Sequence, residues 1–89
     1  MISYLSTVSL GGYDKRETMD MLDSLNNRIC ILYDELEKKR RGRVFDVPPW
    51  GTVRMPARAN RNGFDEKDTD ELISELRSYA VELERELLK

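Results

Sequence analysis

The chain contains one stretch of sequence twice, because residues 12–38 align with residues 63–89 after a shift of 51 positions. Of the 27 aligned pairs, 8 are identical. The identical pairs are Gly12/Gly63, Asp14/Asp65, Thr18/Thr69, Leu25/Leu76, Leu32/Leu83, Glu35/Glu86, Leu36/Leu87 and Lys38/Lys89. An internal repeat sets the architecture of a chain. Here it predicts that one unit, a turn followed by a long helix, is used twice.

Each copy opens on a motif turn of glycine, an aromatic residue and aspartate. An aspartate just before a helix can cap it, and an acid three residues later completes a capping box. Glu17 and Asp68 stand at that spacing. The patterns predict helices from Lys15 to Arg40 and from Glu66 to the C-terminus. The six motif-turn residues are Gly12, Tyr13, Asp14, Gly63, Phe64 and Asp65.

Both predicted helices carry an apolar stripe with alternating spacings of three and four residues, which is a heptad seam. The seams fall in the same phase in the two copies. Each can be buried only against another helix, so they are candidate self-association residues. The seam residues are Leu22, Leu25, Ile29, Leu32 and Leu36 in the first copy, and Ile73, Leu76, Ala80, Leu83 and Leu87 in the second.

Three organisational segments follow. Residues 1–41 hold an extended N-terminal arm and the first repeat, residues 42–62 a Pro/Arg-rich connector, and residues 63–89 the second repeat, as one structural unit. Three prolines and a glycine exclude a helix through the connector. Its apolar residues predict an ordered extended segment packed on a helix face with Trp50 as an anchor; a disordered connector is the alternative. The fold class is all-α, a coiled-coil or helical-bundle oligomer.

Charge is unevenly distributed along a chain whose net charge is −2. Residues 38–61 hold eight bases against the single acid Asp46, and acids outnumber bases on both flanks. Such a segment either pairs with the protein's own acids or contacts an anionic partner, lipid or nucleic acid. The candidate contacts for such a partner are Arg40, Arg41, Arg43, Arg54, Arg58 and Arg61.

No catalytic, cofactor-binding or metal site is predicted. The chain has no histidine, the commonest general base and metal ligand. Its lone cysteine, Cys30, excludes an internal disulfide and fits a reducing compartment. Met1 to Leu10 lacks the features of a signal peptide, and no apolar run approaches the ~20 residues that cross a bilayer. We therefore expect a cytoplasmic, non-enzymatic protein without a small-molecule substrate, peripheral at most to the membrane or division site.

The two helix starts resemble the beginning of the DivIVA domain, found in bacterial cytoplasmic coiled-coil proteins of cell division, polar growth and septum placement. The first copy carries Gly-Tyr-Asp, then Glu17, Thr18 and an apolar pair, with threonine where the family more often has valine. The second copy fits more loosely through Gly-Phe-Asp, Asp68 and Thr69. The two copies cover about 54 of the 89 residues.

The resemblance implies a short turn leading into a parallel coiled coil. In the family, the residues before Gly-Tyr form a crossed loop that presents an aromatic residue and an arginine to the membrane. Leu10-Gly11 and Arg61-Asn62 occupy those positions here. The implied function is a self-associating scaffold or adaptor, a dimer or tetramer that also contacts another coiled-coil or division protein. The alternative function is a small nucleic-acid-binding or antitoxin-like regulator that uses the arginines; nucleic acid is the less favoured partner.

Two helix arrangements remain open. A connector of about 20 residues can reach roughly 65 Å at ~3.3 Å per residue, which exceeds the ~40 Å length of a 27-residue helix. The second helix can therefore return alongside the first in parallel, as an internal pseudo-dimer that places residue 22 near residue 73. The other arrangement is an antiparallel hairpin that pairs with a second chain and places residue 22 near residue 87.

Overall fold

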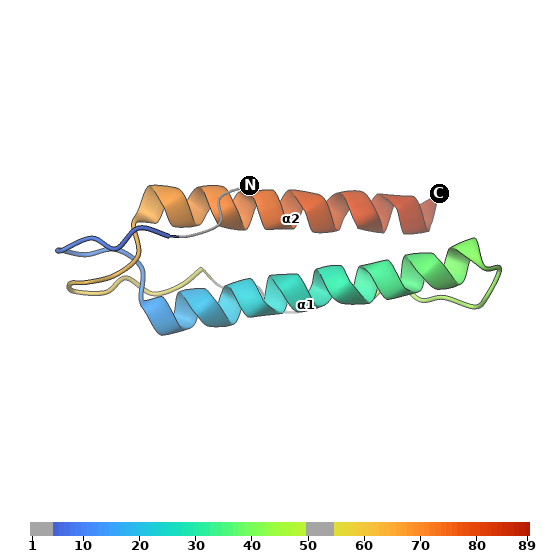
Figure 1. Cartoon of the computed structure of the whole chain (residues 1–89), viewed down its shortest axis with the longest axis horizontal. Helices are drawn as coiled ribbons and strands as arrows, with labels where there is room; N and C mark the ends of the chain where they lie inside the picture. Colours follow the sequence, from blue (N-terminus) through green and yellow to red (C-terminus); the bar gives the residue numbers. More distant parts are fainter. Residues whose placement is uncertain (1–4, 50–54) are drawn as a thin grey trace.

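A computed structural model describes residues 5–49 and 55–89 of the chain. It contains two helices, α1 (Lys15–Arg40) and α2 (Glu66–Leu88), and the described residues outside them form isolated β-bridges. The all-α prediction and both predicted helix starts are confirmed (Figure 1). Trp50, the predicted anchor of the connector, and Arg54, a predicted anionic contact, lie outside the described residues.

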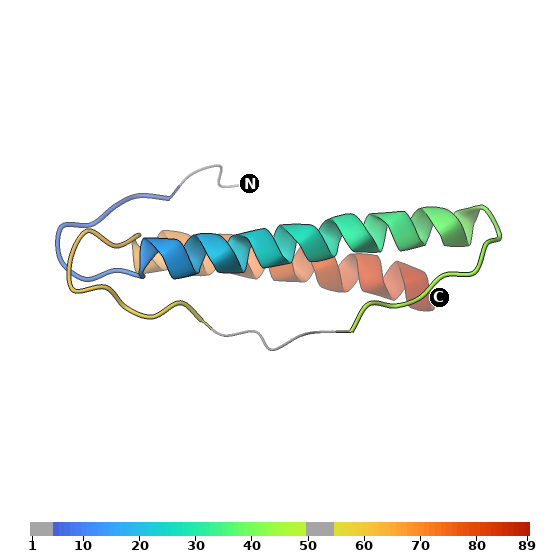
Figure 2. The ribbon, with the colours of Figure 1, turned by 90° about the horizontal axis from the view of Figure 1, so that it is seen from below.

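The two helices lie side by side in parallel, and both begin at the same end of the elongated molecule (Figure 1). At that end, Tyr13 and Phe64, which precede the two helices, are paired by a bridge. At the opposite end, Lys39 of α1 contacts the last turn of α2. The molecule measures 52 × 23 × 15 Å, and the described parts of the connector, residues 42–49 and 55–62, lie alongside the pair (Figure 2). The arrangement is thus the internal pseudo-dimer and not the antiparallel hairpin.

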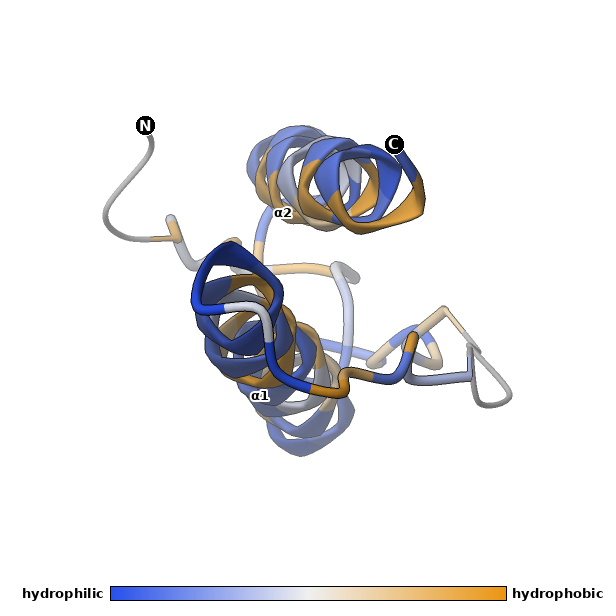
Figure 3. Cartoon of the chain, turned by 90° about the vertical axis from the view of Figure 1, so that its right-hand side faces the viewer, coloured by the Kyte–Doolittle hydropathy of each residue, from blue (hydrophilic) through white to orange (hydrophobic). Residues whose placement is uncertain are grey.

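The core is the interface between the helices. All ten predicted seam residues are buried, with at most 9 % of their surface exposed, and Met21 joins them. The orange stripes of the two helices face each other in Figure 3. Fully burying a leucine or isoleucine contributes about 1.5–3 kcal/mol relative to leaving it exposed. The apolar stripe of each helix is therefore buried within a single chain.

Both helices begin as the capping pattern predicts. The Asp14 carboxylate accepts a hydrogen bond from the Glu17 amide at 2.9 Å, and the Asp65 carboxylate accepts one from the Asp68 amide at 3.0 Å. Gly42, two residues beyond the end of α1, has a φ of +71°. The amides of Gly42 and Arg43 donate to the carbonyls of Lys39 and Lys38, respectively, which is the bonding pattern of a Schellman motif.

Thr18 and Thr69 lie four residues before the first seam residue of each helix. Both are fully buried, but their hydroxyl groups differ in hydrogen bonding. The Thr18 hydroxyl donates to the Asp14 carbonyl at 2.7 Å. The Thr69 hydroxyl has no hydrogen-bond partner among the described residues. An unpaired buried hydroxyl costs free energy, and removing it costs nothing in hydrogen bonds.

We predict that Thr69→Val raises the free energy of unfolding by about 1 kcal/mol, whereas Thr18→Val lowers it by about the same amount. The two variants remove the same group from equivalent positions, so each is the control for the other. Urea denaturation monitored by circular dichroism measures both changes. Equal effects in the two variants would contradict the assigned difference in bonding.

The described part of the connector packs against one side of the helix pair. Phe45 and Val47 are half-buried against the core. The Asp46 amide donates to the Glu35 carboxylate at 3.1 Å, and the Arg28 guanidinium donates to the Pro49 carbonyl at 2.9 Å. The ordered, packed connector predicted from its apolar residues is observed over residues 43–49.

Candidate functional site

Two loops cross at the end of the molecule where both helices begin (Figure 1). We call residues 6–14 the first loop and residues 57–65 the second loop. Their backbones are joined by nine hydrogen bonds. The bond from the Gly63 amide to the Gly11 carbonyl (3.1 Å) stands by itself, and the other eight form four pairs related by exchanging each residue with the one 51 positions away. In each bond the first residue's amide donates to the second residue's carbonyl. The first pair is Val8 to Gly63 (2.9 Å) with Ala59 to Gly12 (2.8 Å), and the second is Gly11 to Asn60 (3.0 Å) with Asn62 to Ser9 (3.3 Å). The third pair is Tyr13 to Phe64 (2.9 Å) with Phe64 to Tyr13 (3.0 Å), and the fourth is Asp14 to Ala57 with Asp65 to Ser6 (both 2.7 Å).

These bonds give this end of the molecule an approximate two-fold symmetry, with the symmetry axis parallel to the helices. They also extend the structural repeat upstream, to residues 6–38 and 57–89. Residues 57–62, which the sequence assigned to the connector, pair as the counterpart of the N-terminal arm. No position is identical between residues 6–11 and 57–62. Backbone-to-backbone hydrogen bonds do not depend on side-chain identity, so the shared geometry leaves no sequence signal.

Two motif glycines allow the loops to cross. A Cβ atom on Gly63 would lie 2.7 Å from the Gly11 carbonyl oxygen and 2.7 Å from the Tyr13 carbonyl oxygen. A Cβ atom on Gly12 would lie 2.6 Å from the Phe64 carbonyl oxygen. These distances are shorter than any real Cβ contact. The glycines of the repeated motif are therefore required by the close approach of two backbones.

The outermost part of the crossed loops carries one apolar and one basic side chain. Leu10 and Arg61 face each other in a bridge between the loops, and Leu10 is 83 % exposed. Arg61 is also exposed. Leu10 and Arg61 occupy the same position of the two copies, and neither copy has the aromatic residue followed by arginine that the resemblance implies; this end of the molecule presents an exposed leucine beside an exposed arginine.

Tyr13 links the first loop to α2. Its hydroxyl donates to the Asp70 carboxylate at 2.8 Å, and its side chain is buried. This hydrogen bond, followed by burial, raises the pKa of the Tyr13 phenol above its ordinary value of 10.0. Exchanging each residue with its repeat equivalent converts Tyr13 and Asp70 into Phe64 and Met19, which cannot form such a bond.

A raised phenol pKa means that the folded state favours the neutral form, so this contribution to stability is complete below pH 10.0 and is lost as pH rises through the folded-state pKa. We predict that Tyr13→Phe lowers the free energy of unfolding by about 1 kcal/mol at neutral pH. The difference from the unmodified chain should shrink at strongly alkaline pH. Denaturation curves of both chains at the two pH values test this. A difference that is independent of pH would contradict the role of the hydroxyl.

The two sides of the helix seam differ at equivalent positions. On one side, Arg28 and Glu84 form an ion pair at 3.4 Å. Exchanging each residue with its repeat equivalent converts this pair into Tyr79 and Tyr33. Those two rings do contact each other, with centroids 6.0 Å apart and an interplanar angle of 55°. The symmetric frame therefore carries an ion pair on one side and an aromatic pair on the other.

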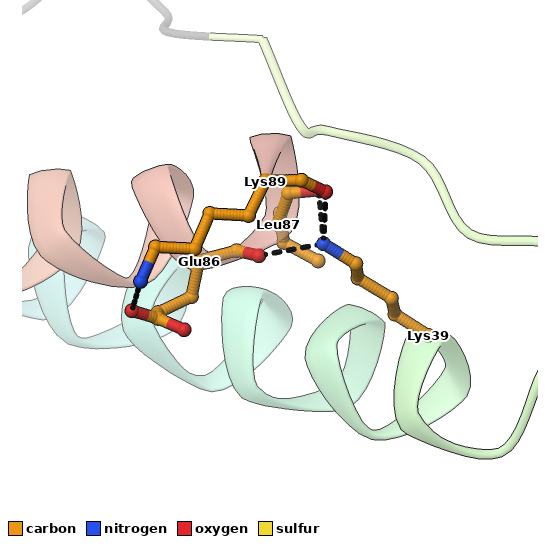
Figure 4. Close-up of polar contacts among 4 residues, drawn as sticks. All are labelled: Lys39, Glu86, Leu87 and Lys89. Carbon is orange, nitrogen blue, oxygen red and sulfur yellow. Dashed lines mark hydrogen bonds and ion pairs between the residues drawn. The ribbon is translucent and has the colours of Figure 1, made fainter.

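Lys39 of α1 connects the two helices at the end of the molecule far from the crossed loops. Its ammonium group donates to the carbonyl oxygens of Glu86, Leu87 and Lys89 at 2.8, 3.0 and 2.8 Å (Figure 4). Carbonyls in the last turn of a helix lack intrahelical partners and favour a positive charge. Lys39 lies three residues after Leu36, at the next position of the seam. A cation therefore takes the place of an apolar seam residue beside the end of α2.

The structure divides the predicted anionic contacts between the two ends of the molecule (Figure 1). The exposed Arg40, Arg41 and Arg43 lie at the end of α1, whereas the exposed Arg58 and Arg61 lie in the second loop. Arg41 pairs with Glu37 at 2.9 Å. Arg58 pairs with Glu66 at 2.7 Å, so among the described residues the basic side chains do not gather on one surface.

Sequence reasoning identified the seam and the motif turns but not the polar contacts between the helices. Arg28, Glu84 and Asp70 all flank the seam. Residues that flank a heptad seam and lie five positions apart in register face each other in parallel helices. Arg28 and Glu84 have that offset once the repeat shift of 51 is removed. The signal was present, but reading it required the parallel register to be known first.

No protein-family model matches the chain, and comparisons with curated proteins and with solved structures also gave no match. Neither helix is long and apolar enough to cross a membrane, over the residues described.

Proposed function

We propose that this protein is a non-enzymatic, self-associating scaffold or adaptor of the DivIVA type, in which one chain supplies both helices of the parallel pair. The observation that carries the proposal is the symmetric crossing of the two loops above helices whose seams face each other in register. The residues of the DivIVA-like motif stand at the crossing point, where the glycines permit the contact. The resemblance favours a role in bacterial cell division or polar localisation, at the cytoplasmic side of the division site.

Because the seams are buried within the chain, self-association uses the outer surface of the pair. Three outer regions are available among the described residues: the crossed-loop end, the far end with its arginines, and the side of the seam opposite the connector. A scaffold of this kind displays these regions at fixed spacing along a rigid rod of 52 Å. Its partners would be a second copy and another coiled-coil or division protein.

Light scattering across a range of protein concentrations, with sedimentation of anionic liposomes in the same preparation, tests the proposal. We expect a mass that rises reversibly from one chain to a dimer or tetramer. Liposome binding that requires Leu10 and Arg61 would add the membrane surface as a partner. A single-chain mass at all concentrations would contradict self-association.

The separation of the arginines does not favour the regulator that binds nucleic acid. A protein that neutralises several phosphates with clustered Lys and Arg loses affinity steeply as salt increases. We expect no binding of duplex or single-stranded DNA or RNA at low salt. Tight binding with a steep salt dependence would contradict the scaffold proposal and favour the regulator that binds nucleic acid.

A further inference from the structure

The two sides of the helix seam are exposed to different degrees. We call the side with Arg28 and Glu84 the covered side, because Pro49 of the connector lies over it and its carbonyl accepts a hydrogen bond from Arg28. The side with Tyr33 and Tyr79 is the open side. In Figure 3 the described part of the connector before residue 50 lies on one side of the seam, and the first loop approaches the other side near the crossed loops.

The distribution of apolar and charged groups over these sides is the reverse of what solvent exposure alone would favour. Arg28 is buried beneath the connector, with 8 % of its surface exposed. Tyr33 and Tyr79 stay 46 % and 43 % exposed on the open side. Met19, on the same side of α1, is 47 % exposed, and Leu72 of α2 is half-buried. These four residues form an apolar strip on the open side, with the exposed Asn26 between Met19 and Tyr33 on α1, and exposed apolar patches mark interaction surfaces.

The charges that border the strip alternate in sign at its four corners. Heptad phase places Arg16 and Glu37 along the α1 border, and Asp68 and Lys89 along the α2 border. Arg16 and Asp68 lie at the crossed-loop end, and Glu37 and Lys89 lie at the far end. Each corner therefore differs in sign from the corner across the strip and from the corner along it.

This alternation makes the open side complementary to itself. A two-fold rotation about an axis along the helices places Arg16 of one copy over Asp68 of the other, and Glu37 over Lys89. A two-fold rotation about an axis across the helices places Arg16 over Glu37, and Asp68 over Lys89. Either rotation pairs all four corners with opposite charges and lays the tyrosine strip of one copy on that of the other. Three of these corners already have contacts. Glu37 and Lys89 pair with Arg41 and Glu86, and the Asp68 carboxylate accepts a hydrogen bond from the Ser6 amide at 3.4 Å. All three contacts are exposed, and exposed ion pairs are weak and exchangeable.

We propose that the open side binds a second copy of this chain, in a symmetric dimer that forms a four-helix bundle around Tyr33 and Tyr79. The inference rests on the proposed self-association and names its surface. A dimer of this kind uses the same patch on both chains, as isologous interfaces do. Aromatic side chains at the centre of an interface carry much of the binding energy, so the tyrosines should dominate the affinity.

The acidic residues between the four corners allow a second, independent test of this surface. Asp23, Glu75 and Glu82 lie on the borders of the strip without a cation of the described chain in an ion pair with them. In the lengthwise two-fold Glu75 faces Asp23 of the other copy, and in the crosswise two-fold it faces Glu82. Replacing Glu75 by lysine converts a repulsion into an attraction in either dimer.

The test is sedimentation equilibrium of the full chain and three variants, with circular dichroism to verify the fold. Tyr33→Glu places a charge in the centre of the strip and should weaken the dimer by about tenfold or more. Ile31→Glu is the matched control, because Ile31 is 39 % exposed on the covered side of the same helix, and it should leave the dimer unchanged. Glu75→Lys should strengthen the dimer.

The outcomes separate this surface from self-association itself. If the chain dimerises but Tyr33→Glu and Ile31→Glu behave alike, the open side is not the interface, and the proposed scaffold still stands. If Tyr33→Glu is poorly folded, the Glu75→Lys variant decides, since an unchanged or weaker dimer would overturn the surface. A chain that is monomeric in every variant would overturn both the surface and the self-association.

Discussion

Gly63→Ala should unfold much of the protein, with a loss of about 3 kcal/mol or more in the free energy of unfolding. The added methyl group would meet three backbone atoms of the first loop, each at 2.7 Å. A flexible side chain could move aside, but these atoms belong to a backbone that is held by hydrogen bonds on both sides. The φ of Gly63 is outside the left-handed region, so the loss comes from the contact alone. Thermal and urea denaturation measure it.

Gly11→Ala is the matched control for this prediction. Gly11 lies in the same crossed loops, but a Cβ atom there would meet nothing within 4 Å. Its φ of +71° makes alanine cost about 1–2 kcal/mol for backbone conformation. We therefore expect a clearly smaller loss than for Gly63→Ala. Equal or reversed losses would mean that the loops do not cross at Gly63.

Leu32→Ala should lower the free energy of unfolding by about 3 kcal/mol. Leu32 is completely buried at the centre of the interface between the helices. Truncation removes its transfer free energy and leaves a cavity that α2 cannot fill, because the crossed loops at one end and Lys39 at the other fix the spacing of the helices. A small domain has only a few times this stability in total, so the effect should be large.

The neighbouring Ile31→Ala variant controls for helix propensity and apolar content. Ile31 is 39 % exposed, on the outside of the same helix. Its truncation should change the free energy of unfolding by less than about 0.5 kcal/mol. Similar losses for the two variants would show that Leu32 is not at a helix interface. The comparison needs denaturation midpoints and slopes at a single protein concentration.

The helices and the seam were predictable because both depend on local chemistry. Asp14 and Asp65 can cap a helix wherever they occur before one, and the alternating spacing of three and four places the ten seam residues on one stripe. Repetition of the pattern after 51 residues added the expectation that the two stripes match in phase. The connector length allowed the parallel arrangement without excluding the antiparallel one.

The resemblance to the DivIVA domain implied a crossed loop, but the periodicity and spacing of this sequence do not predict the crossing, because backbone amides and carbonyls make it. The exposed Leu10 and the pairing of residues 57–62 with the first loop follow from that crossing. Predicting the ion pair of Arg28 with Glu84 and the tilted ring contact of Tyr33 with Tyr79 required knowledge of the helix register. Tyr33 directly follows the seam residue Leu32 in the sequence, and only the structure shows that its side chain stays 46 % exposed.

The most direct test of the internal pseudo-dimer is a disulfide between Leu25→Cys and Leu76→Cys in a chain that also carries Cys30→Ser. These two seam positions are equivalent in the repeat, and both are buried in the interface between the helices. After oxidation at low protein concentration, non-reducing electrophoresis reports whether the bond lies within one chain or between two. We expect a cross-linked single chain with unchanged helicity. Cross-linked dimers, or the absence of a disulfide, would contradict the parallel pairing of the two repeats within one chain.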